Sequence, residues 1–182
     1  KVKQGDKGLV MQRILILLAH PAFERSRVQS SLIDAARQID GVYVHDLYEQ
    51  YPDFMVDVQR EQALLIEHNV IVFQHPFYWY SAPALLKEWQ DLVLEHGFGY
   101  GFKQKALRGK YLINVISAGG GAYAYQPRDN KQFTIRQLLA PFEQMALLCE
   151  MHYLDPFVIY DANSLSELDL SSHIERYKIA LK

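Results

Sequence analysis

The stretch IVFQHPFYWYSAPALLKEW, Ile71–Trp89, begins like a buried strand and ends like a helix. Its first residues form a short apolar run, and Pro83 then suits the first turn of an amphipathic helix. Between these two parts, the aromatic residues Phe77–Tyr80 occupy what we expect to be an exposed turn. Large aromatic side chains are costly to expose, so this turn raises the question of what lies against it.

The same change from strand to helix recurs along the whole chain. Short apolar runs alternate with amphipathic segments of helical length. The expected strands are Arg13–Ala19, Val42–Leu47, Val70–His75, Tyr111–Ser117 and Pro156–Tyr160. The expected helices are Arg27–Ile39, Val58–His68, Pro83–Glu95, Thr134–Leu148 and Ser166–Leu181, the last capped by Ser164 or Ser166. This order predicts an α/β fold with a parallel sheet and helices on both faces.

Right-handed crossovers leave two topologies for five parallel strands. One is a doubly wound flavodoxin-like sheet of order 2-1-3-4-5, and the other is half of a Rossmann fold. In both, ligands bind beyond the carboxyl ends of the strands. A length of 182 residues, 49% of them hydrophobic, suits one domain, which we expect to span residues 12–182. Residues 1–11 are expected to be a disordered or added leader, with Met11 as the natural start.

Composition excludes several classes of function. The net charge of -2 and a pI near 6.4 argue against nucleic-acid binding. The single cysteine, Cys149, favours a reducing cytoplasm, and its apolar neighbours indicate a buried side chain rather than a reactive thiol. No apolar run reaches the roughly 20 residues of a membrane helix, so we expect a cytoplasmic protein, with peripheral docking on the inner face of the cell membrane as an alternative. Asp53, Asp57 and Glu61 lack a converging histidine, which predicts a solvated acidic face and no metal site.

The loop after the first expected strand has the features of an anion site. It contains neither the glycine fingerprint of dinucleotide-binding folds nor a P-loop. It supplies His20, and then Ser26 at the expected start of a helix, where free backbone N–H groups attract anions. Arg25 and Arg27 flank this position and add positive charge. The alternative is that Ser26 only caps the helix and His20 forms a local hydrogen bond.

The loops after the third and fourth strands complete this end of the sheet. Phe77–Tyr80 form either a hydrophobic plug or oligomer interface, or one wall of a pocket for a flat aromatic ligand. The consecutive glycines of SAGGGAYAY (117–125) predict positive φ angles or close approach of the backbone to a ligand, with a flexible turn as the alternative. Tyr123 and Tyr125 follow as phenolic donors. A phosphate joined to a flat heterocycle, as in FMN, matches the three loops better than a sugar phosphate does.

Several motifs resemble the NAD(P)H:quinone oxidoreductase family of flavodoxin-like proteins. They are LLAHP with a following Ser, YPDF, QHPFYWYSAPALLKEW, HGFGYG, LRGKY and the Gly-Gly of SAGGG. The resemblance runs in order from about Arg13 to Leu181, and its most specific part is the block aromatic-Ser-x-Pro-x-x-x-Lys-x-Trp. Within the family, the chain is most similar to the bacterial ancillary proteins of glutathione-regulated potassium-efflux systems.

The resemblance implies a homodimeric flavoprotein that binds FMN, with FAD as the alternative. NAD(P)H reduces the flavin and leaves, and a quinone or similar electrophile then takes the hydride in the same pocket. The cofactor-binding residues implied are His20, Ser26, Arg27, Val28, Gln29, Phe77, Tyr78, Trp79, Tyr80, Ser117, Ala118, Gly119 and Gly120. Tyr125 falls at the position of a tyrosine that assists hydride transfer in larger family members, and we group Tyr123 with it as a catalytic candidate.

The chain also departs from the family pattern, which keeps other functions open. Gln29 stands where the family often has asparagine, and no histidine lies between Gly121 and Phe133 to partner the catalytic tyrosine. One alternative is therefore a regulatory flavoprotein that docks on a potassium-efflux antiporter and turns over little substrate. A third interpretation, a phosphate-handling hydrolase using His20 and His75, lacks a nucleophile or metal cluster near either histidine.

Overall fold

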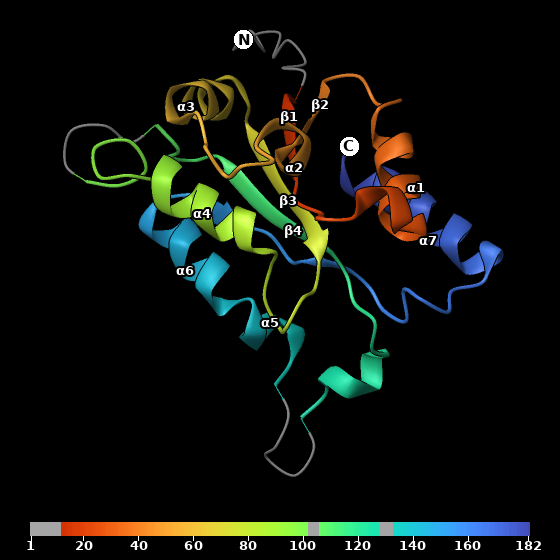
Figure 1. Cartoon of the computed structure of the whole chain (residues 1–182). Helices are drawn as coiled ribbons and strands as arrows, with labels where there is room; N and C mark the ends of the chain where they lie inside the picture. The colour runs from red at the N-terminus through yellow and green to blue at the C-terminus, as the bar shows by residue number, and fades with distance from the viewer. Residues whose placement is uncertain (1–11, 102–105, 128–132) are drawn as a thin grey trace, which may run out of the picture.

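A parallel sheet between two layers of helices makes up the protein (Figure 1). The computed structural model describes residues 12–101, 106–127 and 133–182, so the expected leader, residues 1–11, lies outside the described residues. The strands are β1 Ile14–Leu18, β2 Val42–Asp46, β3 Val70–Pro76, β4 Tyr111–Ser117, β5 His152–Tyr153 and β6 Phe157–Ile159. The helices are α1 Arg27–Ala36, α2 Leu47–Gln50, α3 Val58–Glu67, α4 Ala84–Val93, α5 Ile135–Leu138, α6 Ala140–Leu148 and α7 Glu167–Ala180, with short 3-10 turns η1 Phe23–Arg25 and η2 Ala122–Tyr125.

The strand order β2-β1-β3-β4-β5 confirms the flavodoxin-like topology and excludes the Rossmann half. The fifth expected strand, Pro156–Tyr160, differs from the prediction. Its place is taken by two short strands, β5 and β6, which pair in parallel with the first and last residues of β4. Pro156 lies between them, and because proline has no N–H to donate, the ladder is interrupted there.

The helices follow the prediction with two differences. The helix expected at Thr134–Leu148 is divided into α5 and α6 at Leu139, whose ψ angle is 4°. Pro141 explains the break, because it cannot donate the hydrogen bond that a continuous helix would require of it. Helix α2 was not expected, and it begins where the Asp46 side chain accepts hydrogen bonds from the backbone of Tyr48 and Glu49.

Apolar side chains pack against both faces of the sheet. Figure 1 shows α1 and α7 on one side and α4 and α6 on the other. Trp89 of α4 and Phe142 of α6 lie in the first apolar cluster, and Leu32 of α1 and Tyr177 of α7 lie in the second. Among the described residues, no helix is long and apolar enough to cross a bilayer. Cys149 is buried, as predicted, and burial raises the pKa of its thiol to about 11.

Glu61 contradicts the expected solvated acidic face, because its side chain is fully buried. Its Oε1 accepts a hydrogen bond from the Tyr51 hydroxyl at 2.5 Å and lies 2.8 Å from His45 Nε2. Its Oε2 accepts a hydrogen bond from Trp89 Nε1 at 2.8 Å. Burial alone would raise the pKa of Glu61, but these three partners outweigh burial and lower the pKa. The carboxylate therefore holds β2, α3 and α4 together in the interior.

Candidate functional site

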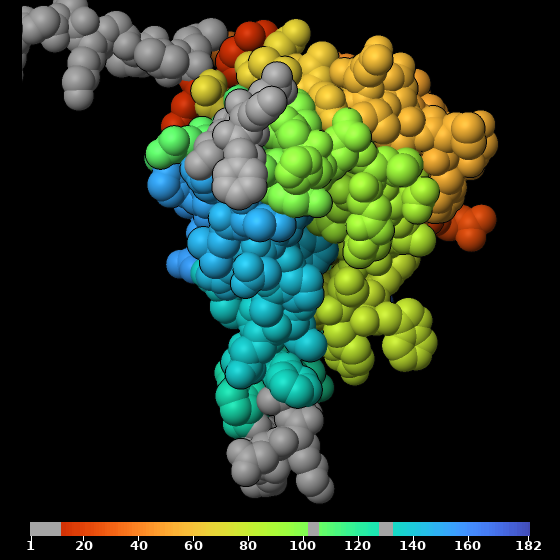
Figure 2. Space-filling view, turned by 90° about the vertical axis from the view of Figure 1, so that its left-hand side faces the viewer, coloured from red at the N-terminus to blue at the C-terminus, as the bar shows by residue number. Residues whose placement is uncertain are grey.

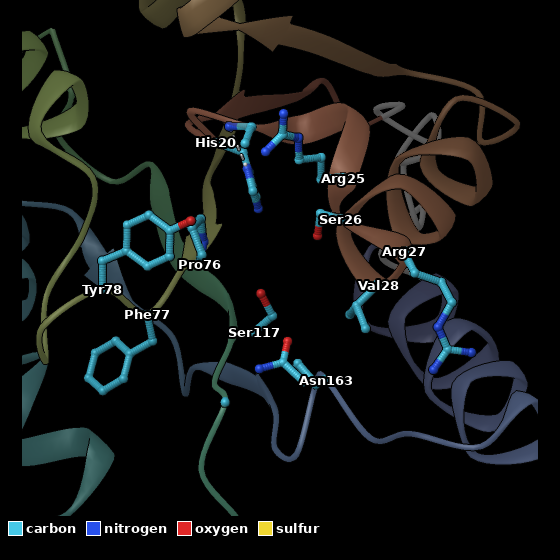
Figure 3. A pocket seen from close by; sticks show the side chains of 13 residues that line it. His20, Arg25, Ser26, Arg27, Val28, Pro76, Phe77, Tyr78, Ser117 and Asn163 are labelled. Carbon is cyan, nitrogen blue, oxygen red and sulfur yellow. Dashed lines mark hydrogen bonds between the residues drawn. The ribbon is translucent and has the colours of Figure 1, made fainter.

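A cavity of about 640 Å³ opens at the carboxyl ends of β1, β3 and β4 (Figure 3). This is the end of the sheet at which doubly wound folds bind ligands, and the volume is typical of small-molecule sites. The lining residues are His20, Ala22, Arg25, Ser26, Arg27, Val28, Pro76, Phe77, Tyr78, Ser117, Gly119, Ala162 and Asn163. The three loops singled out in the sequence thus meet at one cavity.

One side of the cavity is the N-terminus of α1. Ser26 caps this helix, and its Oγ accepts a hydrogen bond from the backbone N–H of Gln29 at 3.3 Å. The N–H groups of Arg27 and Val28 precede the first hydrogen bond within the helix, so they are available to an anion in the cavity.

The two arginines of this loop have different surroundings. The guanidinium of Arg27 donates to the Glu167 carboxylate and to the Leu165 carbonyl at the start of α7. In Figure 3 it points away from the centre of the cavity. The Arg25 side chain is 85% exposed and its ion-pair contact is with the adjacent Glu24, at 3.6 Å. Arg25 is the more exposed of the two cations, and the role of Arg27 as a cofactor ligand remains a prediction.

His20 presents a neutral hydrogen-bond donor. Its Nδ1 accepts a hydrogen bond from the backbone N–H of Ala22 at 3.1 Å, so the ring proton of the neutral form is on Nε2. Burial lowers the pKa of His20, with Glu24 opposing that effect, and the ring is therefore uncharged at neutral pH. Figure 3 shows His20 across the cavity from Ser117.

The aromatic stretch divides into two parts. Phe77 and Tyr78 line the cavity, whereas Trp79 and Tyr80 form the tip of a tight turn. Their φ angles are +47° and +63°, and the backbone N–H of Ser81 donates to the Tyr78 carbonyl at 2.9 Å. Figure 2 shows this segment, in yellow-green, standing out from the surface, and the Trp79 side chain is 93% exposed. As cofactor ligands, Trp79 and Tyr80 remain predictions.

The loop that contains Gly119–Gly121 approaches other parts of the protein closely, and none of these three glycines has a positive φ angle. Gly119 lines the cavity, and a Cβ built on it would meet Asn163 Nδ2 at 3.4 Å. A Cβ on Gly120 would lie 3.3 Å from the Tyr125 hydroxyl. A Cβ on Gly121 would lie only 2.7 Å from the Tyr123 ring, so a larger residue there would require the ring to shift.

Neither catalytic candidate lines the cavity, and one of them contacts a residue that does. The Tyr125 ring packs against Phe77, with 5.9 Å between ring centroids. Burial raises the pKa of Tyr125, which keeps its hydroxyl protonated at neutral pH. Tyr123 is 66% exposed and lies outside the cavity lining. Ala118 is fully buried and its backbone N–H pairs with the Ile159 carbonyl. The roles assigned to these residues remain predictions.

Gln29 and His75, two polar residues singled out in the sequence, are buried beneath the cavity. Gln29 is fully buried, and its Nε2 donates to Ser117 Oγ at 2.9 Å and to the His75 carbonyl at 3.2 Å. Its side chain therefore points toward the sheet and away from the open end of α1. His75 is also fully buried, and burial lowers its pKa to about 4. A hydrolase mechanism needs an accessible imidazole at this position, so this finding removes that interpretation.

The sequence reasoning missed some lining residues. Ala22 and Pro76 are immediate neighbours of predicted sites, but Ala162 and Asn163 follow β6, whose loop was not considered. The signal was present, because β6 ends at the same carboxyl edge as β3 and β4. Among the described residues, no group of three or more His, Cys, Asp or Glu side chains is arranged to hold a metal ion.

Residues 12–181 match the model of a family described as having a flavodoxin-like fold. The chain belongs to this family. The flavodoxin-like protein is also 48% identical, over 165 residues, to the glutathione-regulated potassium-efflux system ancillary protein KefG of Pectobacterium carotovorum subsp. carotovorum. That alignment covers 91% of this chain and 90% of KefG.

Solved structures agree with this assignment. A thermophilic tryptophan halogenase from Streptomycin violaceusniger is 40% identical, with a TM-score of 0.89, and the match covers 92% of this chain and 98% of the other. An NADPH-quinone reductase from P. pentosaceus is 35% identical, with a TM-score of 0.86 and coverage of 94% and 98%. The general stress protein 14 of Treponema denticola, solved in complex with FMN, is 37% identical, with a TM-score of 0.83 and coverage of 92% and 94%.

Proposed function

We propose that this protein binds FMN and is an oxidoreductase that passes hydride from NAD(P)H, through the flavin, to a quinone or similar electrophile. The observation that carries the proposal is one cavity bounded by the open N-terminus of α1, two aromatic side chains and a bare glycine backbone. The FMN complex of general stress protein 14 and the NADPH-quinone reductase from P. pentosaceus support it. FAD is the alternative cofactor.

The residues at the cavity fit such a cofactor. Ser26, Arg25 and the first N–H groups of α1 suit the phosphate, because helix N-termini and arginine both favour anions. Phe77 and Tyr78 suit a flat ring, since aromatic side chains contact ring systems at low entropic cost. When bound, the flavin supplies the hydride chemistry. The protein residues bind and orient it and limit the access of water.

Tyr125 is proposed to assist the hydride step, with Tyr123 as the second candidate. Tyr125 packs on Phe77, a wall residue, and its raised pKa leaves a phenolic proton available as a hydrogen-bond donor. Tyr125→Phe should slow reduction of bound flavin more than it weakens FMN binding, measured by stopped-flow absorbance and fluorescence titration. Equal effects on both measurements would remove Tyr125 from the reaction.

The direct test is titration of the purified protein with FMN, followed by reduction and reoxidation. We expect quenching of flavin fluorescence, bleaching of bound flavin by NADH or NADPH, and rapid recovery of the absorbance on addition of menadione. Absence of any fluorescence or absorbance change with FMN would contradict the cofactor assignment. Binding and bleaching without reoxidation by menadione or benzoquinone would contradict the quinone acceptor only.

A regulatory role is the second proposal, and the similarity to KefG favours it. In this role the protein forms a homodimer in the cytoplasm and docks on a potassium-efflux antiporter at the inner face of the membrane. The test is potassium efflux from cells that express the antiporter with a variant that binds FMN but turns over no quinone. Full activation by that variant would separate regulation from catalysis, and loss of activation would tie the two together.

One solved relative is named a tryptophan halogenase, which raises a different activity. That activity belongs to the name of the relative, and the proposal for this protein remains flavin-dependent reduction.

A further inference from the structure

A chain of buried hydrogen bonds runs from α7, through the sheet, to the cavity. The Tyr177 hydroxyl donates to Gln74 Oε1 at 2.6 Å, and Gln74 Nε2 donates to Gln29 Oε1 at 2.9 Å. Gln29 Nε2 donates in turn to Ser117 Oγ at 2.9 Å. Tyr177, Gln74 and Gln29 are all fully buried, so water does not compete for these bonds. Ser117, at the end of β4, is the member of the chain that lines the cavity.

Which atom donates in each of these hydrogen bonds follows from what the neighbouring atoms can donate or accept. Gln29 Nε2 also lies 3.2 Å from the His75 carbonyl oxygen, which can only accept. The amide nitrogen of Gln29 must therefore face His75 and Ser117, and its oxygen must face Gln74. Gln74 meets that oxygen with its own amide nitrogen and turns its oxygen toward Tyr177.

This direction decides what Ser117 can do. Its Oγ accepts a hydrogen bond from Gln29, so its own proton must point elsewhere. Among the described residues, no hydrogen bond is donated by this hydroxyl, and Figure 3 shows the hydroxyl directed into the cavity. The oxidised flavin ring carries carbonyl oxygens and imine nitrogens that accept hydrogen bonds.

We propose that Gln29 is a positioning residue that orients the Ser117 hydroxyl as a donor to an acceptor atom on the ring system of bound flavin. The proposal rests on the proposed FMN function. It gives Gln29 a role other than the phosphate contact expected from the sequence, because Gln29 acts through Ser117 and does not reach the ligand itself.

Gln29→Glu provides the test, because it keeps the length of the side chain and reverses its polarity toward Ser117. At a pH at which the introduced carboxyl is ionised, its oxygen at this position accepts the Ser117 proton, and the hydroxyl is lost as a donor to the ligand. Ser117→Ala removes the same donor directly. Each change should weaken FMN binding by roughly 3- to 10-fold, the range expected for one uncharged hydrogen bond.

The decisive measurement is a double-mutant cycle on FMN affinity, read by fluorescence quenching. Because both substitutions remove one hydrogen bond, the double variant should bind FMN within about twofold of Ser117→Ala alone. Ser117→Thr keeps a hydroxyl and is the matched control, so in that background Gln29→Glu should again weaken binding. Ser117→Ala and Gln29→Glu should also produce the same shift in the absorbance spectrum of bound FMN, which a general loss of packing would not do.

Losses that add in the double variant, in a protein that melts at the normal temperature, would overturn the proposal, because Gln29 would then act independently of Ser117. If Gln29→Glu fails to fold, Gln29→Met takes its place in the same cycle, since it fills the space without hydrogen bonding. Failure of the wild-type chain to bind FMN would instead overturn the proposed function, so the two failures are distinguishable.

Discussion

His20, Ser26 and Ser117 show how single residues define the character of the cavity. The Nε2–H of His20 and the hydroxyl of Ser117 are both donors, and Ser26 opens the N-terminus of α1. The site therefore favours a ligand rich in acceptor atoms. Gly119 adds a stretch of backbone without a side chain.

Gly119→Val should weaken FMN binding by at least about tenfold, because added methyl groups in a filled site are costly. The fold should tolerate the change, since Gly119 has no positive φ and its added Cβ would meet only Asn163 Nδ2 at 3.4 Å. Fluorescence titration and thermal melting measure the two effects. Gly121→Ala is the contrast, because a Cβ 2.7 Å from the Tyr123 ring should lower the melting temperature. Unchanged FMN affinity in Gly119→Val would contradict a flavin ring at this glycine.

Local sequence identified the cavity residues that adjoin expected strand ends, but it did not reveal the buried polar contacts. Ser26 was recognisable because a hydroxyl before a helix is a local signal. The partners of Gln29, in contrast, are the carbonyl of His75 and the hydroxyl of Ser117, 46 and 88 residues away. Only the assembled sheet brings these groups together, so the burial of Gln29 could not be predicted from its neighbours.

At the scale of elements, apolar strands were easy to predict and interruptions were not. β1, β3 and β4 are central and buried, and so their sequences are nearly continuous apolar runs. The division of the edge strand into β5 and β6 depends on Pro156, and the break between α5 and α6 on Pro141. Both prolines were visible, but their effect depends on which N–H groups the neighbouring elements require.

Glu61→Gln should destabilise the packing of β2, α3 and α4. The amide retains the shape of the carboxylate, but it brings a donor toward a group of existing donors, His45, Tyr51 and Trp89. Leaving a buried hydrogen-bond donor without its acceptor costs about 1 to 3 kcal/mol of unfolding free energy. Urea denaturation measures this cost. Glu67→Gln, which alters an exposed ion pair with Arg13, is the control and should change stability by less than about 1 kcal/mol.

The turn at Trp79 and Tyr80 should become more stable when these residues are replaced by ones that favour positive φ angles. Paired positive φ angles in a tight turn favour Asn-Gly, and each large side chain held there costs roughly 1 kcal/mol. Trp79→Asn combined with Tyr80→Gly should therefore raise the stability by about 1 to 2 kcal/mol in urea denaturation. The control, Trp79→Phe, keeps a large aromatic side chain at a positive φ angle and should leave the stability unchanged. A less stable double variant would indicate that contacts of the two aromatic rings outweigh the backbone strain.

At the scale of the whole molecule, His75 should make stability depend on pH. Burial holds its folded-state pKa near 4, whereas the unfolded chain has the ordinary value of 6.5. Between these values the unfolded state binds more protons, so stability falls as the pH falls. Lowering the pH from 7.5 to 5.0 should cost roughly 2 kcal/mol through this residue.

The comparison that isolates this effect is urea denaturation of the wild type and His75→Gln at both pH values. Glutamine does not titrate and keeps an acceptor for the Asn114 amide, which lies 3.2 Å from His75 Nε2. The variant should lose about 2 kcal/mol less than the wild type over this interval. Equal losses in the two proteins would assign the acid sensitivity to other groups.

Because Cys149 is buried, chemical labelling of its thiol measures how often the core opens around it. It is the chain's single sulfhydryl, it is 2% exposed, and it ends α6 against the sheet. An alkylating reagent can modify it only in molecules whose core has opened there, so each added mass in a mass spectrum records one such event. A ligand that binds only the closed form slows this labelling in proportion to its saturation. Under the proposed function, slower labelling in the presence of FMN is expected to report cofactor binding at a sulfur atom outside the cavity lining, without any flavin colour.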